Sequence, residues 1–343
     1  MLRHKHLVSY VITTVEFMGA GEDEATLVSV PPYHIAGISA VLSSVYAGRR
    51  VVQLGAFSPE DWVHTVRREH VTHAMVVPTM LGRILDVLER EGESLPTLRA
   101  LSYGGGRMPM PVIERAMTDL PHVGFVNAYG LTETSSTIAV LDPEDHRVAW
   151  TASDPDARKR LGSVGRPIPS LELEIRDTAG LPVPTGERGE IWVRGEQVAG
   201  EYLDGQAPSS DGWFPTHDGG FLDSEGYLYV EGRLDDVIVR GAENMSPGEI
   251  EEVLLAHPAV VDAAVVGLPD IEWGERVVAA VVVVAEASVT EPELQAWVAA
   301  RLRSSRTPET IEFRAELPYN ETGKLLRRVL RSELLGPPGP PSG

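Results

Sequence analysis

The 343-residue chain is 43% hydrophobic and has a formal net charge of −20 and no cysteine; its length predicts two to three domains at roughly 100–200 residues each. Zero cysteines exclude disulfides, thiolate metal sites and a cysteine nucleophile, and the acidic balance disfavours nonspecific binding to nucleic acid or anionic lipid. Because no apolar run approaches the roughly 18 residues of a membrane span and no signal-peptide pattern follows Met1, we expect a cytoplasmic protein without a membrane span.

The first part of the chain alternates between predicted helices and predicted strands. In order, the pattern predicts a helix over residues 1–18, a strand over 25–30, a helix over 36–47, a strand over 50–54, a helix from Pro59, a strand over 72–77, a helix over 78–91, a strand over 98–103, a helix over 109–118 and a strand over 124–127. Ser58 and Pro59 suit the N-cap and the first helical position. Strands separated by helices of this length predict a mostly parallel sheet.

From about residue 160 the pattern changes. Short strands over 171–176, 189–194 and 227–231 predict a β-rich subdomain. A small α+β unit follows, with strands over 237–240, 260–267, 277–285 and 310–314 and helices over 247–256 and 291–304. We therefore divide the chain into residues 1–160, 161–234 and 235–334, followed by a Pro/Gly-rich tail, 335–343, that we expect to be disordered.

Two clusters follow predicted strands of the parallel sheet. Gly104, Gly105 and Gly106 would let a ligand approach the backbone at a strand end, although a simple strand-to-helix turn explains them as well. The stretch Asn127-Ala-Tyr-Gly-Leu-Thr-Glu-Thr-Ser-Ser136 offers hydroxyls and N–H groups for a phosphate and a carboxylate for Mg²⁺. Its alternative is a helix N-cap with a solvated acid.

Three later residues suit contacts to a nucleotide. The carboxylate of Asp218 suits a pair of ribose hydroxyls, and its alternative is a turn with Gly219-Gly220. Arg233 suits phosphate or ribose, and its alternative is a salt bridge with Asp235 or Asp236. Lys324 follows the turn glycine in Asn320-Glu-Thr-Gly-Lys324 and can follow developing charge on a transferred group; its alternative is a surface loop.

Together these elements resemble the superfamily of adenylate-forming (AMP-binding) enzymes. The resemblance covers nearly the whole chain, from Pro31-Pro-Tyr-His34 to Lys324, and it is specific because Tyr129-Gly-Leu-Thr-Glu133 and Gly232-Arg-Leu-Asp-Asp236 occur together. The stretch from Val239 to Glu251 is similar to the acyl-CoA synthetase, or acyl-CoA ligase, branch. The implied fold is α/β: part of a large core, with a mostly parallel sheet, helices and a β-rich subdomain, followed by a small mobile α+β C-terminal domain.

The resemblance also implies a role for each site residue. Gly104, Gly105 and Gly106 would line the adenine pocket, Tyr129 would stack on the base, and Asn127 and Gly130 would belong to the same AMP site. Thr132 would contact the α-phosphate, Glu133 would bind Mg²⁺, and Asp218 would hold the ribose with Arg233 nearby. Asp235 would be the hinge, Lys324 would stabilise charge during adenylation, Gly241 would lie near the pantetheine channel, and His34 would lie by the acyl pocket. The implied reaction makes acyl-AMP from a carboxylic acid and ATP with Mg²⁺, and then an acyl thioester with coenzyme A. A carrier protein is the weaker alternative acceptor, and the acid cannot be deduced.

The chain departs from the family in one major respect. It contains neither the Ser/Thr/Gly-rich loop ending in Pro-Lys-Gly nor a G-x-x-x-x-G-K-[ST] loop, and Met1-Leu-Arg-His-Lys-His-Leu7 resembles the residues just after that loop. Smaller departures are His217 and Ala242, where relatives have glycine. Three interpretations follow: an incorrect or fragmentary start of a full acyl-CoA synthetase, a short enzyme that only forms thioesters from a supplied acyl-adenylate, or a non-enzymatic remnant that binds AMP or a partner.

The missing segment predicts two properties of this polypeptide. Adenylation should be slow or absent, because a loop that holds charge in the transition state typically contributes several kcal/mol. Parallel strands need helices on both faces, so we expect an exposed apolar face and hence aggregation, dimerisation or a partner chain that covers it.

Overall fold

A computed structural model describes residues 2–31, 33–199, 211–241, 243–284, 287–320 and 324–336. Gly323 of the predicted lysine turn, Ala242 and residues 337–343 of the predicted tail lie outside the described residues. The chain forms two units: unit 1 comprises Met1–Thr216 and Gly220–Val230, and unit 2 comprises His217–Gly219 and Glu231–Gly343. The three-part division made from the sequence stays a prediction.

A seven-stranded sheet in the order β2-β1-β3-β4-β5-β6-β7 forms the centre of unit 1. Its strands are β1 (Ala25–Val28), β2 (Arg50–Gln53), β3 (His73–Val76), β4 (Ala100–Gly104), β5 (Gly124–Leu131), β6 (Ser136–Leu141) and β7 (Arg166–Pro167). The pairs among β1 to β5 are parallel, whereas β6 runs antiparallel to β5 and β7 antiparallel to β6. The predicted mostly parallel sheet is therefore confirmed, and the carboxyl ends of its parallel strands meet at one edge.

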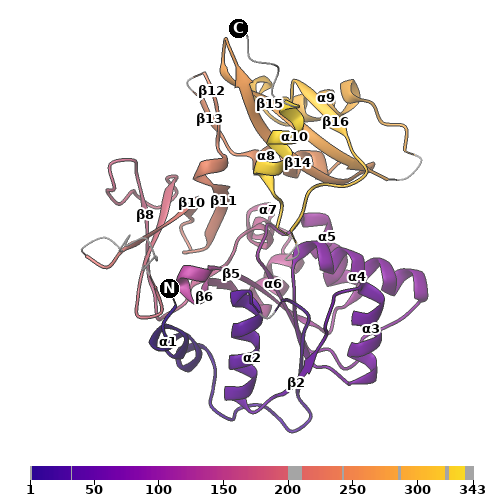
Figure 1. Ribbon diagram of the computed structural model, residues 1–343, viewed down its shortest axis with the longest axis vertical. Coiled ribbons are helices and arrows are strands. Elements are labelled where there is room, and N and C mark those ends of the chain that lie inside the picture. The colour runs from indigo at the N-terminus through magenta and orange to yellow at the C-terminus, as the bar shows by residue number, and fades with distance from the viewer. Residues whose placement is uncertain are drawn as a thin grey trace. The chain divides into compact units, whose positions relative to one another are not determined.

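Helices cover both faces of this sheet. They are α1 (His4–Thr14), α2 (Ile35–Ala47), α3 (Pro59–Arg68), α4 (Pro78–Glu91), α5 (Met110–Asp119), α6 (Pro143–Thr151) and α7 (Pro155–Lys159). Figure 1 shows α2 on one side of the strands and α3, α4 and α5 on the other. On the latter side Trp62, Leu81 and Ile113 pack against Leu101 and Phe125 in one buried apolar cluster, which fixes the strands that end at the candidate site.

Local sequence signals explain where several of these helices begin and end. The Ser58 hydroxyl accepts a hydrogen bond of 3.0 Å from the Asp61 N–H at the start of α3, and Pro59 follows it, as predicted. Gly48 and Gly92 end α2 and α4 in the left-handed conformation that glycine adopts without steric cost.

A second sheet has the order β11-β10-β9-β8. Its strands are β8 (Glu172–Arg176), β9 (Gly189–Arg194), β10 (Phe214–Leu222) and β11 (Leu228–Arg233). The predicted strands are confirmed, but β10 was missed because its Gly219-Gly220 pair indicates a turn. The glycine at 220 is needed within the strand: a Cβ there would lie 2.3 Å from the Tyr229 carbonyl oxygen.

Unit 2 contains a small α+β fold with β15 paired to β12, β14 and β16. Its elements are β12 (Ile238–Arg240), β13 (Glu243–Met245), α8 (Pro247–Leu255), β14 (Val260–Asp270), β15 (Gly274–Val283), α9 (Glu291–Ala299), β16 (Thr310–Phe313) and α10 (Arg327–Leu335). The predicted strand and helix order is confirmed. Helix α9 ends at Ala299 rather than at residue 304, and α10 was not predicted.

Some apolar side chains of unit 1 face solvent. Val8, Ile12 and Val45 on α1 and α2, together with Phe17 and Met18 after α1, each expose more than half of their surface. These side chains lie on or beside helices and not on the sheet, so the exposed apolar face expected from the sequence stays a prediction. In the described part of the chain, no helix combines the length and hydrophobicity needed to cross a bilayer.

Candidate functional site

The predicted glycine cluster and the predicted hydroxyl-rich stretch lie at adjacent strand ends in unit 1. Gly104, the last residue of β4, pairs in register with Ala128 on β5. A Cβ on Gly104 would lie 2.3 Å from the Ala128 carbonyl oxygen, so strand pairing itself requires this glycine. Gly105 has φ +78°, whereas a Cβ on Gly106 would meet nothing closer than Pro78 at 3.9 Å. Gly105 and Gly106 are therefore not required by a backbone clash of the kind that Gly104 would meet, and both are exposed.

Strand β5 continues beyond its predicted end and carries the aromatic residue. The strand runs to Leu131, so Tyr129 and Gly130 lie on it rather than in a loop. Tyr129 is half-buried against a second apolar cluster. The Asn127 side chain is buried and donates a 3.0 Å hydrogen bond to the Ser163 carbonyl, which gives it a structural task. A Cβ on Gly130 would overlap the Ser136 carbonyl oxygen at 1.5 Å, so this glycine permits the pairing of β5 with β6.

The connection between β5 and β6 presents the predicted phosphate and metal ligands. Thr132–Thr134 forms a 3-10 turn, with Thr132 exposed and Glu133 partly exposed. Ser135 and Ser136, which follow it, have φ values of +57° and +120°. Such values are uncommon for residues with a side chain and persist only where the surroundings enforce them. The tips of this turn are thus accessible while its backbone is strained.

His34 lies beyond the end of β1 and caps the helix that follows. Its Nδ1 accepts a hydrogen bond of 3.3 Å from the Ala36 N–H at the start of α2. Since β1 and β4 both flank β3 in parallel, His34 belongs to the same edge of the sheet as the glycine cluster. Its predicted place by the acyl pocket stays a prediction.

Asp218 and Arg233 lie together in unit 2. An Asp218 carboxylate oxygen lies 3.4 Å from an Arg233 guanidinium nitrogen, and the Asp218 side chain is 8% exposed. Arg233 also lies 3.9 Å from Asp235, whose side chain is 82% exposed. The alternative considered for Arg233, a salt bridge with Asp235, is therefore present. The Arg233 guanidinium nevertheless lies closer to Asp218 than to Asp235. Asp218 itself lies in β10, not in the turn weighed as its alternative.

The Lys324 backbone is anchored although its side chain faces solvent. The Asn320 side-chain oxygen accepts the Lys324 N–H at 2.8 Å, and the Asn320 N–H donates to the Lys324 carbonyl at 3.0 Å. The next helix begins with Arg327, which contacts Glu251 and the Val265 carbonyl.

Asp236, beside the predicted hinge, belongs to the same cluster. Arg327 lies 3.4 Å from Asp236. Burial raises the pKa of the Asp236 carboxyl, and the positive charges of Arg327, Lys324 and Arg233 partly oppose this rise. The lysine and the residue after the predicted hinge thus share one electrostatic environment, which the sequence alone did not indicate because Asp236 and Arg327 are far apart along it.

Gly241 lies in a tight turn against an aromatic ring. Its N–H donates to the Trp273 carbonyl at 2.6 Å, its φ is +61°, and a Cβ would lie 3.4 Å from the Trp273 ring. Glycine is the residue that such a left-handed turn favours. Its predicted place near a pantetheine channel stays a prediction.

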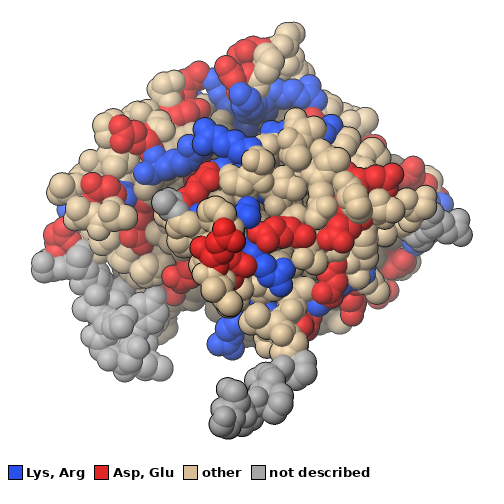
Figure 2. Space-filling view, turned by 90° about the horizontal axis from the view of Figure 1, so that it is seen from above, with Lys and Arg blue, Asp and Glu red and all other residues tan. Residues whose placement is uncertain are grey.

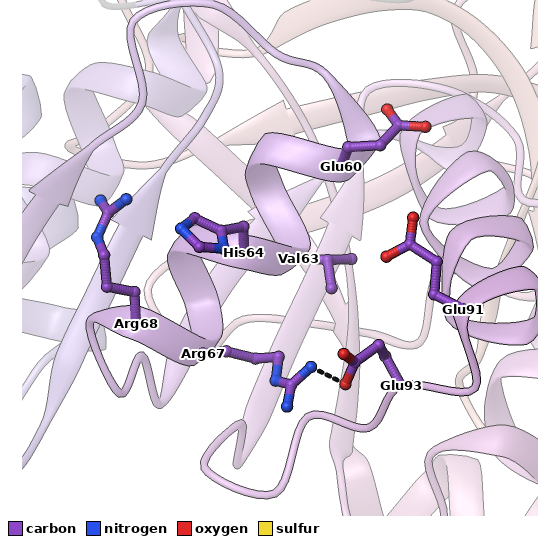
Figure 3. Close-up of a pocket in the computed structure, with 7 residues that line it drawn as sticks. All are labelled: Glu60, Val63, His64, Arg67, Arg68, Glu91 and Glu93. Atoms are coloured by element: carbon purple, nitrogen blue, oxygen red, sulfur yellow. Dashed lines mark ion pairs between the residues drawn. The ribbon is translucent and has the colours of Figure 1, made fainter.

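A separate hollow lies between α3 and α4, away from these residues. It has a volume of about 400 Å³ and is lined mainly by charged side chains: Glu60, Val63, His64, Arg67, Arg68, Glu91 and Glu93. Figure 3 shows Arg67 and Glu93 paired across it. No residue predicted for the site lines this hollow, so we assign it no role.

In the described part of the chain, no group of three His, Asp or Glu side chains is arranged to hold a metal ion. Glu133 could therefore hold Mg²⁺ only together with phosphate oxygens and water, which is the usual arrangement for this ion. Figure 2 shows Lys and Arg side chains gathered in bands on the face that it draws, so the net charge of −20 is unevenly spread.

Sequence comparison identifies the family. Residues 1–203 match the AMP-binding enzyme family, and residues 249–324 match the AMP-binding enzyme C-terminal domain. The chain is 37% identical over 317 residues to 2-succinylbenzoate–CoA ligase of Bacillus licheniformis, covering 91% of this chain and 62% of that protein. It is 36% identical over 325 residues to the enzyme of that name from Bacillus subtilis, covering 93% and 63%. The chain thus spans less than two thirds of the length of these curated relatives.

Solved structures agree. The amide bond synthetase McbA from Marinactinospora thermotolerans superposes with a TM-score of 0.85 at 31% identity, covering 95% of this chain and 65% of that one. The o-succinylbenzoate CoA synthetase (MenE) from Bacillus subtilis, solved with the acyl-adenylate intermediate OSB-AMP, gives a TM-score of 0.81 at 33% identity and covers 97% and 66%. The predicted fold class is confirmed, and this chain belongs to the AMP-binding enzyme family.

Proposed function

We propose that this chain carries the nucleotide-binding and thioester-forming parts of an AMP-forming acid–CoA ligase. The observation that supports it most directly is the register of β4 and β5, which aligns Gly104 with Ala128, the residue before Tyr129, so that the glycine cluster and the hydroxyl-rich stretch lie at the ends of neighbouring, paired strands. The relatives named as CoA ligases make this activity the first to test.

In this proposal the two units divide the work. In unit 1, Tyr129 stacks on the adenine beside Gly106, Thr132 contacts the α-phosphate, and Glu133 holds Mg²⁺ against the nucleotide. In unit 2, Asp218 binds the ribose hydroxyls, with the Arg233 guanidinium 3.4 Å away. Lys324 stabilises charge during adenylation, Gly241 lies by coenzyme A, Asp235 is the hinge, and His34 lies by the acid.

The proposed reaction has two steps. A carboxylate oxygen attacks the α-phosphorus of ATP and displaces pyrophosphate, which leaves acyl-AMP. The coenzyme A thiolate then attacks the acyl carbonyl carbon, the carbon–oxygen bond to AMP breaks, and AMP departs with its electron pair. Thr132 and Lys324 act on the first step, whereas binding by Tyr129 and Asp218 serves both.

We further propose that the 343-residue polypeptide performs the second step better than the first. Its 343 residues contain no Ser/Thr/Gly-rich phosphate loop, and groups that hold charge in a transition state typically contribute several kcal/mol. The second step uses no pyrophosphate and needs only the adenylate and the thiol. A binding module that holds AMP without turnover is the main alternative.

The relatives also suggest which acid to try. 2-Succinylbenzoate is the substrate in the names of several of them, so synthetic 2-succinylbenzoyl-AMP is the first substrate to supply. Because a neighbouring fold is an amide bond synthetase, an amine and a carrier protein should be compared with coenzyme A as acceptors.

Calorimetry with AMP, thioester formation from acyl-AMP and coenzyme A, and ATP–pyrophosphate exchange test the proposal together. We expect AMP binding, thioester formation and weak exchange. Asp218→Asn should weaken AMP binding about tenfold, whereas Asp156→Asn, a control at a side chain that is 83% exposed, should not. Lys324→Ala should lower exchange but spare thioester formation, with Lys159→Ala as its control. Absence of both AMP binding and thioester formation would refute the proposal.

Self-association is a second part of the proposal. Val8, Ile12 and Val45 are exposed apolar side chains on α1 and α2. Because these two helices contact each other, we propose that their exposed apolar side chains form the contact surface. Sedimentation of the wild-type chain and of an Ile12→Glu/Val45→Glu variant should show concentration-dependent association only for the former; a monomeric wild type would exclude it. Cytoplasmic localisation stays a prediction.

A further inference from the structure

Gln197 is a buried amide that contacts the strained turn after β5. It lies in the segment after β9, in unit 1, and is fully buried. Its side-chain NH₂ donates to the Thr134 carbonyl at 2.9 Å and to the Thr137 carbonyl at 2.8 Å. Its side-chain oxygen accepts a 3.1 Å hydrogen bond from the Ser170 hydroxyl. Since both carbonyls only accept, these contacts fix which end of the amide carries the nitrogen.

The backbone around Gln197 is tied to the same turn. The Ser135 hydroxyl donates to the Gln197 carbonyl at 2.8 Å, and the Ala199 N–H donates to the Glu133 carbonyl at 2.6 Å. These contacts surround Ser135 and Ser136, whose φ values of +57° and +120° are unfavourable for residues with a Cβ. The turn keeps this conformation because hydrogen bonds hold it from several sides.

We propose that Gln197 is a positioning residue that holds the turn so that Thr132 and Glu133 face the phosphate of a bound adenylate. This inference rests on the proposed function. Gln197 is buried behind the turn and bonds to its backbone, so it acts through Thr132 and Glu133. Among side chains of this length, only a neutral amide supplies two donors to Thr134 and Thr137 and one acceptor to Ser170.

Gln197→Glu is the informative substitution, because it keeps the shape and removes both donors. At pH 8 a carboxylate would face two carbonyl oxygens, whereas at lower pH its protonated form regains one donor. Gln295→Glu is the matched control: Gln295 in unit 2 donates in the same way to two carbonyls, of Pro308 and Glu309, at 3.1 and 3.2 Å. Ser170→Ala is a milder variant that removes one bond to Gln197.

The readout is the affinity for AMP relative to that for adenosine, measured by calorimetry at pH 8 and pH 6. For Gln197→Glu at pH 8 we expect AMP binding to weaken about tenfold or more, adenosine binding to change less than about twofold, and the AMP loss to shrink at pH 6. Ser170→Ala should change the ratio in the same direction by a smaller factor, and Gln295→Glu should leave it unchanged.

Each other outcome has a distinct meaning. If the wild type binds AMP more tightly than adenosine and the Gln197→Glu ratio equals that of the wild type, the positioning role is wrong while the proposed function stands. If AMP and adenosine affinities fall together in Gln197→Glu, and Ser170→Ala leaves the ratio unchanged, Gln197 serves folding only and the inference is overturned. If the wild type binds neither, the proposed function fails and the inference fails with it.

Discussion

Tyr103→Phe should destabilise unit 1 although it removes a single oxygen atom. Tyr103 lies on β4 directly before Gly104 and is fully buried, as is His146 on α6. The Tyr103 hydroxyl lies 2.8 Å from His146 Nε2, and His146 Nδ1 lies 2.7 Å from the Asp142 carbonyl oxygen. A carbonyl only accepts, so Nδ1 carries the proton, Nε2 is the acceptor, and Tyr103 must be the donor. Phenylalanine leaves that acceptor without its donor.

The magnitude follows from burial. A buried acceptor that loses its donor costs about 1–3 kcal/mol, and the small void left by the hydroxyl adds little. Removing both polar groups in Tyr103→Phe/His146→Phe should cost less than the sum of the single changes, with a coupling of about 0.5–3 kcal/mol. The Asp142 carbonyl keeps a partner in that variant, because it also accepts the His146 backbone N–H at 3.1 Å.

Urea unfolding measured by tryptophan fluorescence gives the free energies of unfolding. Tyr10→Phe is the matched control, because the Tyr10 hydroxyl makes only a long, half-buried contact of 3.4 Å with Thr137; it should cost well under 1 kcal/mol. If Tyr103→Phe unfolds within about 0.3 kcal/mol of the wild type, or if the double variant shows no coupling, the reasoning about the buried pair is wrong.

Three further predictions follow from the same structure. Gly130→Ala should destabilise unit 1 by more than about 3 kcal/mol, because its Cβ would lie 1.5 Å from the Ser136 oxygen. Gly55→Ala is the control, since a Cβ there would meet nothing within 4 Å, and equal urea midpoints for the two variants would contradict the clash. Arg327→Met should cost about 3–5 kcal/mol, because it removes the ion partner of the buried Glu251, which keeps the hydrogen bond from the Val265 N–H. Arg328→Met on the exposed side of α10 should be neutral, and similar losses for both variants would argue against the ion pair. Burial lowers the pKa of His146 below the ordinary histidine value of about 6.5. At lower pH the unfolded chain therefore binds a proton that the folded chain does not, and the free energy of unfolding should fall as pH drops below about 6.5, by up to about 1.4 kcal/mol per pH unit. A flat profile between pH 7.5 and 5.5 would count against this prediction.

The sequence predicts much of the fold because its local signals agree with the tertiary structure. Periodicity and breakers located β1 to β5 and α2 to α5 within a few residues, since apolar strands alternate with capped helices there. The failures have local causes. Strand β10 carries two adjacent glycines, which indicate a turn unless one knows that Tyr229 crowds the second of them. Helix α10 is mostly polar and buries only Leu330, so its apolar signal is weak.

Short motifs allowed candidate site residues to be proposed from the sequence, whereas contacts between residues far apart in the chain could not be predicted. Thr132 and Asp218 could be picked from the sequence because their chemistry suits a nucleotide. Gln197, by contrast, is 60 residues or more from the turn that it contacts, and a glutamine in a loop carries no periodic or motif signal. Such partners emerge only when the chain is folded, because their role is defined by which backbone groups they meet.

The glycines of the site show why a motif must be interpreted with its surroundings. Gly104 and Gly130 are required by the protein itself, since a Cβ on either would collide with a backbone oxygen. Gly106 meets no such obstacle, so it alone of these three leaves its backbone accessible to a ligand. The same division applies to the turn: buried Thr134 and Ser135 fix the backbone, and exposed Thr132 projects from it. A rigid frame with accessible tips is what preorganised binding of a charged group requires, which makes this edge of the sheet the best-supported place for a phosphate.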